Sequence, residues 1–230
     1  MDVAEAAVEV EGVSHRFGSV LALDSVNFSV AAGEMFALLG PNGGGKSTIF
    51  RLLATVLPIQ EGRAAVDGLD LREQARAARG ILGVLFQHPS LDRKLTVEEN
   101  LRHHGRLYGL FGAALARRIG EVCEPLGLAE RRSAKVEVLS GGWQRRVEIA
   151  KALVPRPRVV LLDEPTTGLD PVARRDFWQH LSSIRSTEGC TILVTTHLME
   201  EAARCDRVVI LDRGKVVAAG APAELVSEVG

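Results

Sequence analysis

The chain has almost no net charge. Its 230 residues contain 28 Lys and Arg against 29 Asp and Glu, which gives a formal net charge of −1. Proteins that bind nucleic acid or an anionic membrane over a broad surface carry an excess of positive charge. The charge balance therefore argues against both classes, and we expect no nucleic-acid partner.

Paired cysteines, long apolar runs and a secretion signal are also missing. The three cysteines are scattered and form no C-x-x-C motif, so they predict buried core residues in a reducing compartment: Cys123, Cys190 and Cys205. Apolar runs such as Val159 to Leu162 fall far below the roughly 18 residues of a membrane helix. The acidic start, MDVAEAAVEV, contains no basic segment followed by an apolar one. These absences predict a cytoplasmic protein.

Short apolar runs alternate with helical patterns along most of the chain. The runs that predict buried strands are Met35 to Leu39, Ile81 to Phe86, Val159 to Leu162 and Thr191 to Thr195. A helix is predicted from Lys46, since apolar residues follow at helical spacing. Strands separated by helices are typical of a parallel sheet with both faces covered. We therefore predict an α/β fold.

Two regions depart from this alternation. Val8 to Val13 and Asp24 to Val30 have no helix between them and predict a small antiparallel β patch near the N-terminus. The segments that predict helices instead are Leu101 to Leu110, Ala113 to Leu126 and Trp143 to Val154. We expect one domain over residues 1–230, with a helical subdomain at about 88–155 inserted in the α/β core.

The sharpest motif fits G-x-x-x-x-G-K-[ST] and lies between a predicted strand and a predicted helix. It comprises Gly40, Pro41, Asn42, Gly43, Gly44, Gly45, Lys46, Ser47 and Thr48. Small residues let backbone N–H groups surround phosphate oxygens, and the helix that follows adds the positive end of its dipole. Lys46 is expected to reach the β- and γ-phosphates, and the Ser47 hydroxyl to bind Mg²⁺. The motif predicts a phosphate-loop (RecA-like) core.

Two acidic residues, Asp163 and Glu164, follow the predicted strand at Val159 to Leu162. Ligands of open α/β sheets bind beyond the carboxyl ends of the strands. We therefore expect Asp163 to lie near the Mg²⁺ held by Ser47, and Glu164 to orient or deprotonate the attacking water.

A second candidate anion site lies far along the chain, at Leu139-Ser140-Gly141-Gly142. Ser140 is a good N-cap, and the two glycines leave the first N–H groups of the next helix bare. With the motifs above, this segment resembles the signature of the ATP-binding cassette (ABC) ATPases, the nucleotide-binding domains of ABC transporters. The resemblance covers the chain from about Val8 to Leu225 and implies that the serine-glycine turn completes the ATP site of a partner subunit.

The family usually has Gln after the signature glycines, whereas this chain has Trp143 and then Gln144. The resemblance assigns four further residues by their place in the family's order: Phe17, Gln87, Asp170 and His197. It implies that Phe17 stacks on adenine and that Gln87 reaches Mg²⁺ and the attacking water. It also implies that Asp170 lies in a loop crossing the dimer interface, and that His197 contacts the γ-phosphate.

The resemblance further implies an assembly and a reaction. ATP would be hydrolysed to ADP and phosphate at the interface of a homodimer, or of a heterodimer with a related ATPase. The dimer would energise a separate integral-membrane permease, so the chain would be peripheral on the inner face of the cell membrane. Segments such as Phe86 to Asp92 and Thr195 to Ala202 are similar to ATPases of daunorubicin-type drug-resistance exporters.

The alternatives are a soluble ABC ATPase working on DNA or ribosomes, and another phosphate-loop enzyme. No asparagine begins the N-K-x-D motif with which GTPases read guanine, and the serine-glycine signature belongs neither to GTPases nor to small-molecule kinases. Arg145 and Arg146 are interpreted as surface charge on the signature helix. His103 and His104 are interpreted as a solvated helix face rather than as a metal site.

Overall fold

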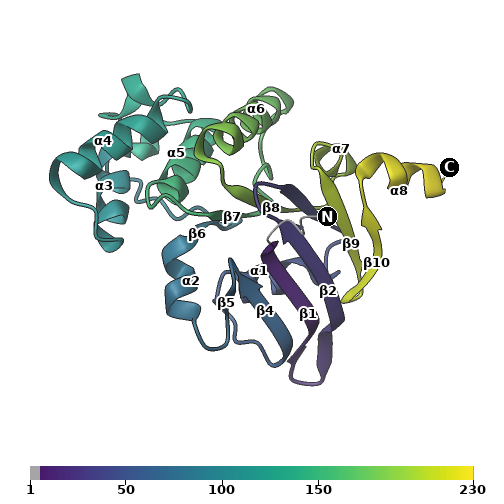
Figure 1. Ribbon diagram of the computed structural model, residues 1–230. Coiled ribbons are helices and arrows are strands. Elements are labelled where there is room, and N and C mark those ends of the chain that lie inside the picture. Colours follow the sequence, from purple (N-terminus) through teal and green to yellow (C-terminus); the bar gives the residue numbers. More distant parts are fainter. Residues whose placement is uncertain (1–5, 230) are drawn as a thin grey trace.

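The computed structural model describes residues 6–229, so the first five residues of the acidic start lie outside the described residues. Its centre is a six-stranded sheet in the order β10-β9-β3-β8-β7-β6 (Figure 1). The strands are β3 (Met35–Leu39), β6 (Leu82–Leu85), β7 (Val159–Asp163), β8 (Thr191–Thr196), β9 (Arg207–Asp212) and β10 (Lys215–Gly220). Every neighbouring pair is parallel except β9 and β10. The predicted α/β fold with a parallel core is confirmed.

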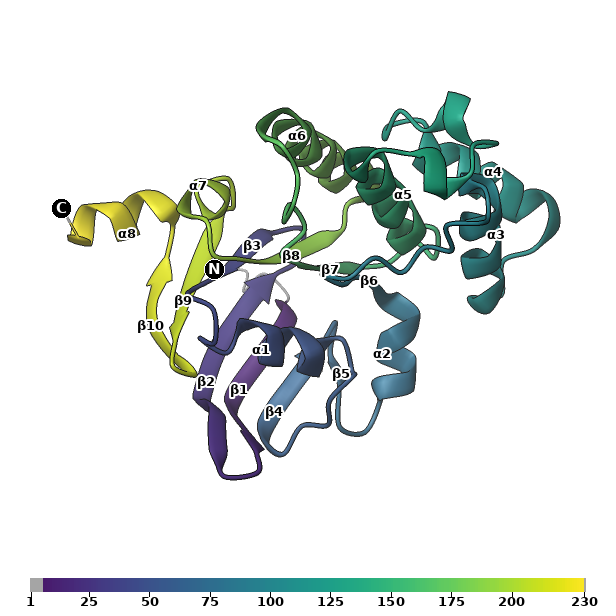
Figure 2. The same cartoon turned by 180° about the vertical axis from the view of Figure 1, so that it is seen from behind.

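A second sheet is antiparallel and follows the order β2-β1-β4-β5. Its strands are β1 (Ala6–Phe17), β2 (Val20–Ala31), β4 (Glu61–Val66) and β5 (Leu69–Asp70). The predicted N-terminal patch is confirmed, and β4 and β5 extend it. Helix α1 (Lys46–Leu53) lies between the two sheets (Figure 2), with its apolar side chains in the core that they share.

The parallel sheet is buried on both faces. Successive side chains of a strand point to opposite faces, and each face packs against its own hydrophobic core. Phe36 and Leu38 of β3 join the core shared with α1 and the antiparallel sheet. Met35, Ala37 and Leu39 join the opposite core, formed with the helices. The loops at the carboxyl ends of β3, β6, β7 and β8 are thus held by strands packed on two sides.

Helices fill the segment between β6 and β7, as the predicted insertion requires. They are α3 (Val97–Leu107), α4 (Gly112–Cys123) and α5 (Gly141–Leu153), with single-turn 3-10 helices at Ala129–Arg131 and Val136–Val138. The remaining helices are α2 (Ala75–Ile81), α6 (Pro171–Glu188), α7 (Met199–Ala202) and α8 (Pro222–Val229). Figure 1 shows α5 and α6 above the sheet and α3 and α4 further out. The boundaries 88–155 of a helical subdomain stay a prediction.

The three cysteines are buried and free, as predicted. Within residues 6–229, no helix is both long enough and apolar enough to cross a bilayer.

Candidate nucleotide-binding site

The glycine-rich segment forms the turn between β3 and α1. A Cβ on Gly40 would lie 2.1 Å from the carbonyl oxygen of Leu211, so only glycine fits beneath β9. Gly45 has φ +108° and occupies the N-cap of α1, where no side chain caps the helix. The first turn of α1 contains no acidic residue. Bare N–H groups and the helix dipole therefore make this turn a site for anions.

Lys46 is buried at the mouth of this turn. Its Nζ donates to the carbonyl oxygens of Gly40 (2.7 Å) and Pro41 (2.9 Å), and lies 3.9 Å from Oε1 of Glu164. Burial lowers the pKa of Lys46, and the negative charges of Glu164 and Asp163 act in the opposite direction. The nearest partners of the ammonium are uncharged carbonyl groups, and the carboxylate of Glu164 is further away. The positive charge of Lys46 is therefore not neutralised by a close ion pair and can attract an anionic ligand.

Asp163 ends β7 and is 6% exposed. Its Oδ1 accepts a hydrogen bond of 2.6 Å from the Thr195 hydroxyl of β8. Burial raises the pKa of Asp163; the hydrogen bond from Thr195 opposes this shift, and the charge of Glu164 adds to it. A desolvated carboxylate with one hydrogen-bond donor is a good ligand for a cation.

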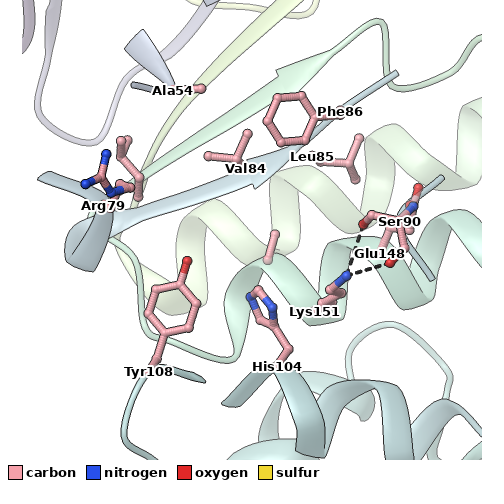
Figure 3. A pocket seen from close by; sticks show the side chains of 12 residues that line it. Ala54, Arg79, Val84, Leu85, Phe86, Ser90, His104, Tyr108, Glu148 and Lys151 are labelled. Carbon is pink, nitrogen blue, oxygen red and sulfur yellow. Dashed lines mark hydrogen bonds between the residues drawn. The ribbon is translucent and has the colours of Figure 1, made fainter. Parts of the chain in front are cut away.

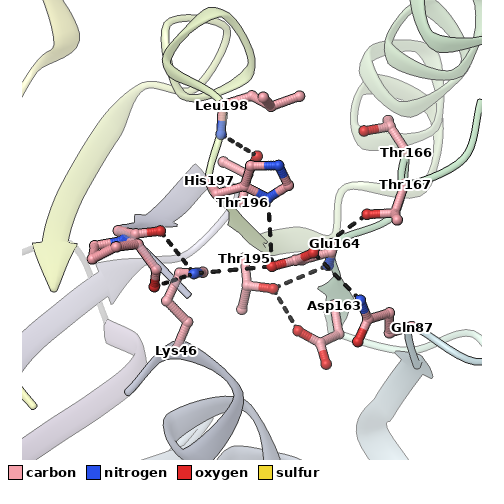
Figure 4. A network of polar contacts seen from close by, with 12 residues as sticks. Lys46, Gln87, Asp163, Glu164, Thr166, Thr167, Thr195, Thr196, His197 and Leu198 are labelled. Atoms are coloured by element: carbon pink, nitrogen blue, oxygen red, sulfur yellow. Dashed lines mark hydrogen bonds and ion pairs between the residues drawn. The ribbon is translucent and has the colours of Figure 1, made fainter. Parts of the chain in front are cut away.

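The backbone turns sharply at Glu164, whose φ of +41° is rare for a residue other than glycine. Its N–H donates to the hydroxyl oxygen (3.0 Å) and to the carbonyl oxygen (3.1 Å) of Thr195, which hold the strained conformation. The Glu164 side chain is thereby directed toward Lys46 and Gln87 (Figure 4).

Glu164 is where side chains from four segments meet (Figure 4). Gln87, which follows β6, donates from Nε2 to Oε2 at 3.4 Å, and the Thr167 hydroxyl lies 3.3 Å from the same oxygen. Nδ1 of His197, which follows β8, lies 3.6 Å from Oε1, the oxygen nearest Lys46. The carboxylate is thus oriented by an amide, a hydroxyl, an imidazole and an ammonium.

A cavity of about 350 Å³ opens in front of these groups. Its lining contains many of the predicted site residues: Ala22, Asn42, Gly43, Gly45, Lys46, Ser47, Thr48, Gln87 and Glu164. Phe17 ends β1 and is 47% exposed. It lies on the same hairpin as Ala22 and contacts the ring of His15 edge-on.

The second predicted anion site, at the Ser140 turn, lies away from the phosphate loop in this copy of the chain. Ser140, Gly142, Trp143 and Asp170 line a separate cavity of about 280 Å³, and none of them lines the cavity at Lys46. Ser140 occupies the N-cap of α5 as predicted, but its side chain makes no capping hydrogen bond. Ser140 and Gly141 are exposed, so this helix start faces solvent.

Asp170 is the cap of α6, because its Oδ1 accepts from the N–H groups of Val172 (2.9 Å) and Ala173 (3.0 Å). Trp143 lies in the first turn of α5, and its ring is flanked by two guanidinium groups. The guanidinium carbons of Arg131 and Arg146 lie 4.3 Å and 4.4 Å from the centre of its ring.

The interpretation of Arg145 as surface charge is wrong, because this side chain is buried and bonded to three carbonyl groups and Glu148. Arg146 is half-buried; beyond Trp143 it pairs with Asp176 at 3.2 Å. His103 is exposed as expected, whereas His104 is half-buried and lines another cavity. Burial, with a smaller effect of the Lys151 charge, lowers the pKa of His104 to about 4.

Sequence reasoning also missed Thr195 and Thr167, whose hydroxyls hold Asp163 and Glu164. The signal was present: Thr195 lies at the end of a predicted strand, beside the strand that carries the two acids. Polar residues there reach the ligand edge of the sheet.

Similarity to known proteins agrees with this geometry. The ABC transporter family model matches residues 23–167. The probable multidrug ABC transporter ATP-binding protein YbhF of Escherichia coli is 43% identical over 96% of this chain, which spans 38% of YbhF. The Nod factor export ATP-binding protein I of Sinorhizobium fredii is 42% identical over 98% of this chain, which spans 66% of that protein.

Solved structures show the same fold. The structure of cbiO1 from Clostridium perfringens, part of the ABC transporter complex cbiONQ, superposes with a TM-score of 0.90 at 29% identity, covering 98% of this chain and 92% of cbiO1. The ATP-binding cassette MJ0796, a dimer bound to ADP and Pi in a post-hydrolysis state, has a TM-score of 0.82 at 28% identity. That match covers 94% of this chain and 98% of MJ0796.

A phosphate loop between β3 and α1, with two acids at the end of the parallel strand β7, defines a nucleotide-binding protein. The family match and the relatives make the assignment narrower. The chain belongs to the ABC transporter family, as an ATP-binding cassette.

Proposed function

We propose that this chain binds ATP and hydrolyses it to ADP and phosphate as the nucleotide-binding subunit of an ABC exporter. The observation that carries the proposal is the position of Glu164. Its carboxylate lines the cavity formed by the phosphate loop, with Lys46, Gln87 and His197 around it. That is the arrangement that an attacking water beside a terminal phosphate requires.

The phosphates are held by the loop amides from Gly40 to Thr48, by the N-terminus of α1 and by Lys46. Lys46 lines the cavity, and the groups that accept its hydrogen bonds on the loop are uncharged carbonyls. Glu164 takes the proton of the water, and His197, 3.6 Å from the same carboxylate, contacts the γ-phosphate. Phe17 offers an exposed ring for the adenine base.

Oxygen donors for Mg²⁺ are available beside the loop. Ser47 and Gln87 line the cavity and supply a hydroxyl and an amide oxygen, and Asp163 supplies the desolvated carboxylate. This all-oxygen set fits Mg²⁺, which binds one or two carboxylates together with substrate phosphates. When bound, the ion would supply positive charge next to the phosphates.

A second copy, or a related ATPase, completes each site. Ser140, Gly141 and Gly142 form an exposed helix start that this copy leaves away from its own phosphate loop. An exposed, uncapped helix N-terminus binds anions, so we assign it to the γ-phosphate held by the partner subunit. Asp170, in the same cavity, lies where the two copies would meet.

The partner in the membrane is an integral-membrane permease. A cavity of about 290 Å³ beside the loop of Gln87 is a docking site for it (Figure 3), lined by Arg79, Phe86, Ser90, His104, Tyr108 and Lys151 among others. The names of YbhF and of the Nod factor proteins support export as the direction. The chain would then lie on the inner face of the membrane. A soluble ABC ATPase that is not coupled to transport is the alternative.

Two measurements test the proposal. The purified chain should release phosphate from ATP in the presence of Mg²⁺, and a chain that releases none would contradict the assignment. Expressed in its own host, the chain should also co-purify with a membrane subunit. Recovery only in the soluble fraction, without such a subunit, would favour the soluble alternative.

A further inference from the structure

Arg145 lies in the second turn of α5, with 10% of its side chain exposed. Its Nε donates to the carbonyl oxygen of Pro165 at 2.6 Å, and its Nη1 to that of Phe86 at 3.1 Å. Its Nη2 lies 3.5 Å from the carbonyl oxygen of Asp163. One guanidinium thus binds the residues on both sides of Glu164 and the residue before Gln87.

Glu148, one turn further along α5, holds this guanidinium in place. Its Oε2 accepts from Nη1 of Arg145 at 2.7 Å, and its Oε1 accepts from the N–H of Ser90 at 2.7 Å. Lys151 then donates to the carbonyl and hydroxyl oxygens of Ser90 (Figure 3). The pair Arg145–Glu148 therefore ties both ends of the segment Gln87 to Pro89 to α5.

The planar fork of Arg145 suits this task better than a single charge. Arginine presents five N–H donors in fixed directions, and here they reach three segments of the chain. Burial lowers the pKa of Arg145, and the hydrogen bond and charge of Glu148 oppose this shift. The group stays charged because a guanidinium is not deprotonated in proteins. A charge buried without a partner would be costly, which explains the presence of Glu148.

We propose that Arg145 is a positioning residue that, with Glu148, sets the places of Glu164 and Gln87 relative to helix α5. Because α5 begins at the Ser140 turn, any shift of that turn against a partner's nucleotide moves the backbone on either side of Glu164. The inference rests on the proposed hydrolysis of ATP. It adds that the signature helix and the hydrolytic carboxylate are connected within one copy through a buried ion pair.

Arg118 offers a matched control within the chain. It is also buried, and it donates to the carbonyl oxygens of Leu153 (2.7 Å) and Val154 (3.3 Å) and to Glu188 (2.8 Å). Its contacts lie at the far ends of α5 and α6, so Arg118→Lys should lower stability without moving Glu164.

The test compares the wild-type full chain with Arg145→Lys, Arg118→Lys and the double variant Arg145→Gln/Glu148→Gln. For each we would measure kcat and KM for ATP per folded molecule and the thermal midpoint. We expect both Arg145 variants to lose about tenfold to 100-fold in kcat at nearly unchanged KM, because small displacements of a catalytic group cost this much. Arg118→Lys should keep the wild-type kcat.

The double variant separates positioning from simple stability. It leaves no unpaired buried charge, so its thermal midpoint should lie close to that of the wild-type protein while kcat stays low. Wild-type kcat in the double variant, or an equal loss in Arg118→Lys, would overturn the inference. If the Arg145 variants do not fold, Glu148→Ala carries the test: a several-fold loss of kcat supports the inference, and unchanged kcat overturns it.

The two proposals fail separately. A wild-type chain that releases no phosphate contradicts the proposed function. A wild-type chain that turns over ATP, together with Arg145 variants that match it per folded molecule, contradicts only the positioning role.

Discussion

Single residues in strained or desolvated positions determine the chemistry of this site. Glu164 has a left-handed backbone that the oxygens of Thr195 hold in place, and Lys46 is buried with carbonyl groups as its nearest partners. Both arrangements cost free energy in the folded protein, and each leaves a charged group facing the cavity.

Replacing Glu164 by Gln tests its assignment as the base. The amide has nearly the same shape but cannot accept the proton of a water, so we expect steady-state phosphate release to fall at least about 100-fold while ATP binding persists. Glu200→Gln is the control, since Glu200 is an exposed partner of Arg174. Turnover close to that of the wild type in Glu164→Gln would show that Glu164 is not the base.

Replacing Lys46 by Ala removes a buried cation from the phosphate loop. Hydrogen bonds to charged groups are worth about 1.5–3 kcal/mol, so the affinity for ATP should fall at least about tenfold. Isothermal titration checks this, with Lys94→Ala as the control because Lys94 is a surface residue 80% exposed. Equal affinities for the two variants would place the phosphates elsewhere.

At the scale of elements, the sequence was sufficient to predict the strands that carry the site, but not all of the strands that pair with them. The four predicted strands and the helix from Lys46 are present, since apolar runs next to a glycine-rich turn are unambiguous. Strands β9 and β10 and the strands β4 and β5 were not predicted. The β9–β10 and β4–β5 pairs are local hairpins with two-residue turns at Arg213-Gly214 and Asp67-Gly68, a signal that the sequence analysis did not use. Only the pairing of β9 with β3 and of β4 with β1 depends on residues distant in sequence.

Helix α5 shows where pattern reasoning fails for polar residues. Its apolar side chains are buried, with Val147 and Ala150 fully inside. Arg145, and likewise His104 on α3, were misassigned because a charged or polar residue next to an apolar stripe is normally exposed. The backbone carbonyls that satisfy Arg145 lie at or just after the carboxyl ends of β6 and β7, and only the folded structure brings them together.

Burial of His104 predicts that the stability of the protein depends on pH. Its pKa is lowered from the ordinary 6.5 to about 4, so between these values the unfolded chain takes up the proton more readily than the folded one. Stability should therefore fall as the pH drops from 6.5 to 4, by up to about 3 kcal/mol.

Urea unfolding as a function of pH checks this. His104→Gln should flatten the dependence over this range, whereas His103→Gln, at the exposed neighbour, should leave it intact. If the wild-type protein gained unfolding free energy relative to His104→Gln as the pH fell from 6.5 to 4, the assignment would be contradicted.

At the scale of the whole molecule, the candidate site is in two parts that lie in separate cavities of one copy. The phosphate loop, Gln87 and Glu164 line one, with His197 beside Glu164, and Ser140, Gly142 and Asp170 line the other. Local motifs predicted the phosphate loop, the two acids and the Ser140 turn, and the family resemblance assigned Gln87, Asp170 and His197. Their separation within one protomer follows from the fold, and it is the reason for the proposal that a second copy completes each site.

The most direct test of this account is the mass of the Glu164→Gln chain in solution, measured by light scattering with and without ATP and Mg²⁺. We expect ATP to raise the mass to twice the 24.8 kDa of one copy. Adding Ser140→Arg at the exposed helix start should abolish this doubling while ATP still binds. A mass that stays at one copy with saturating ATP, or doubling that Ser140→Arg leaves intact, would contradict the shared site.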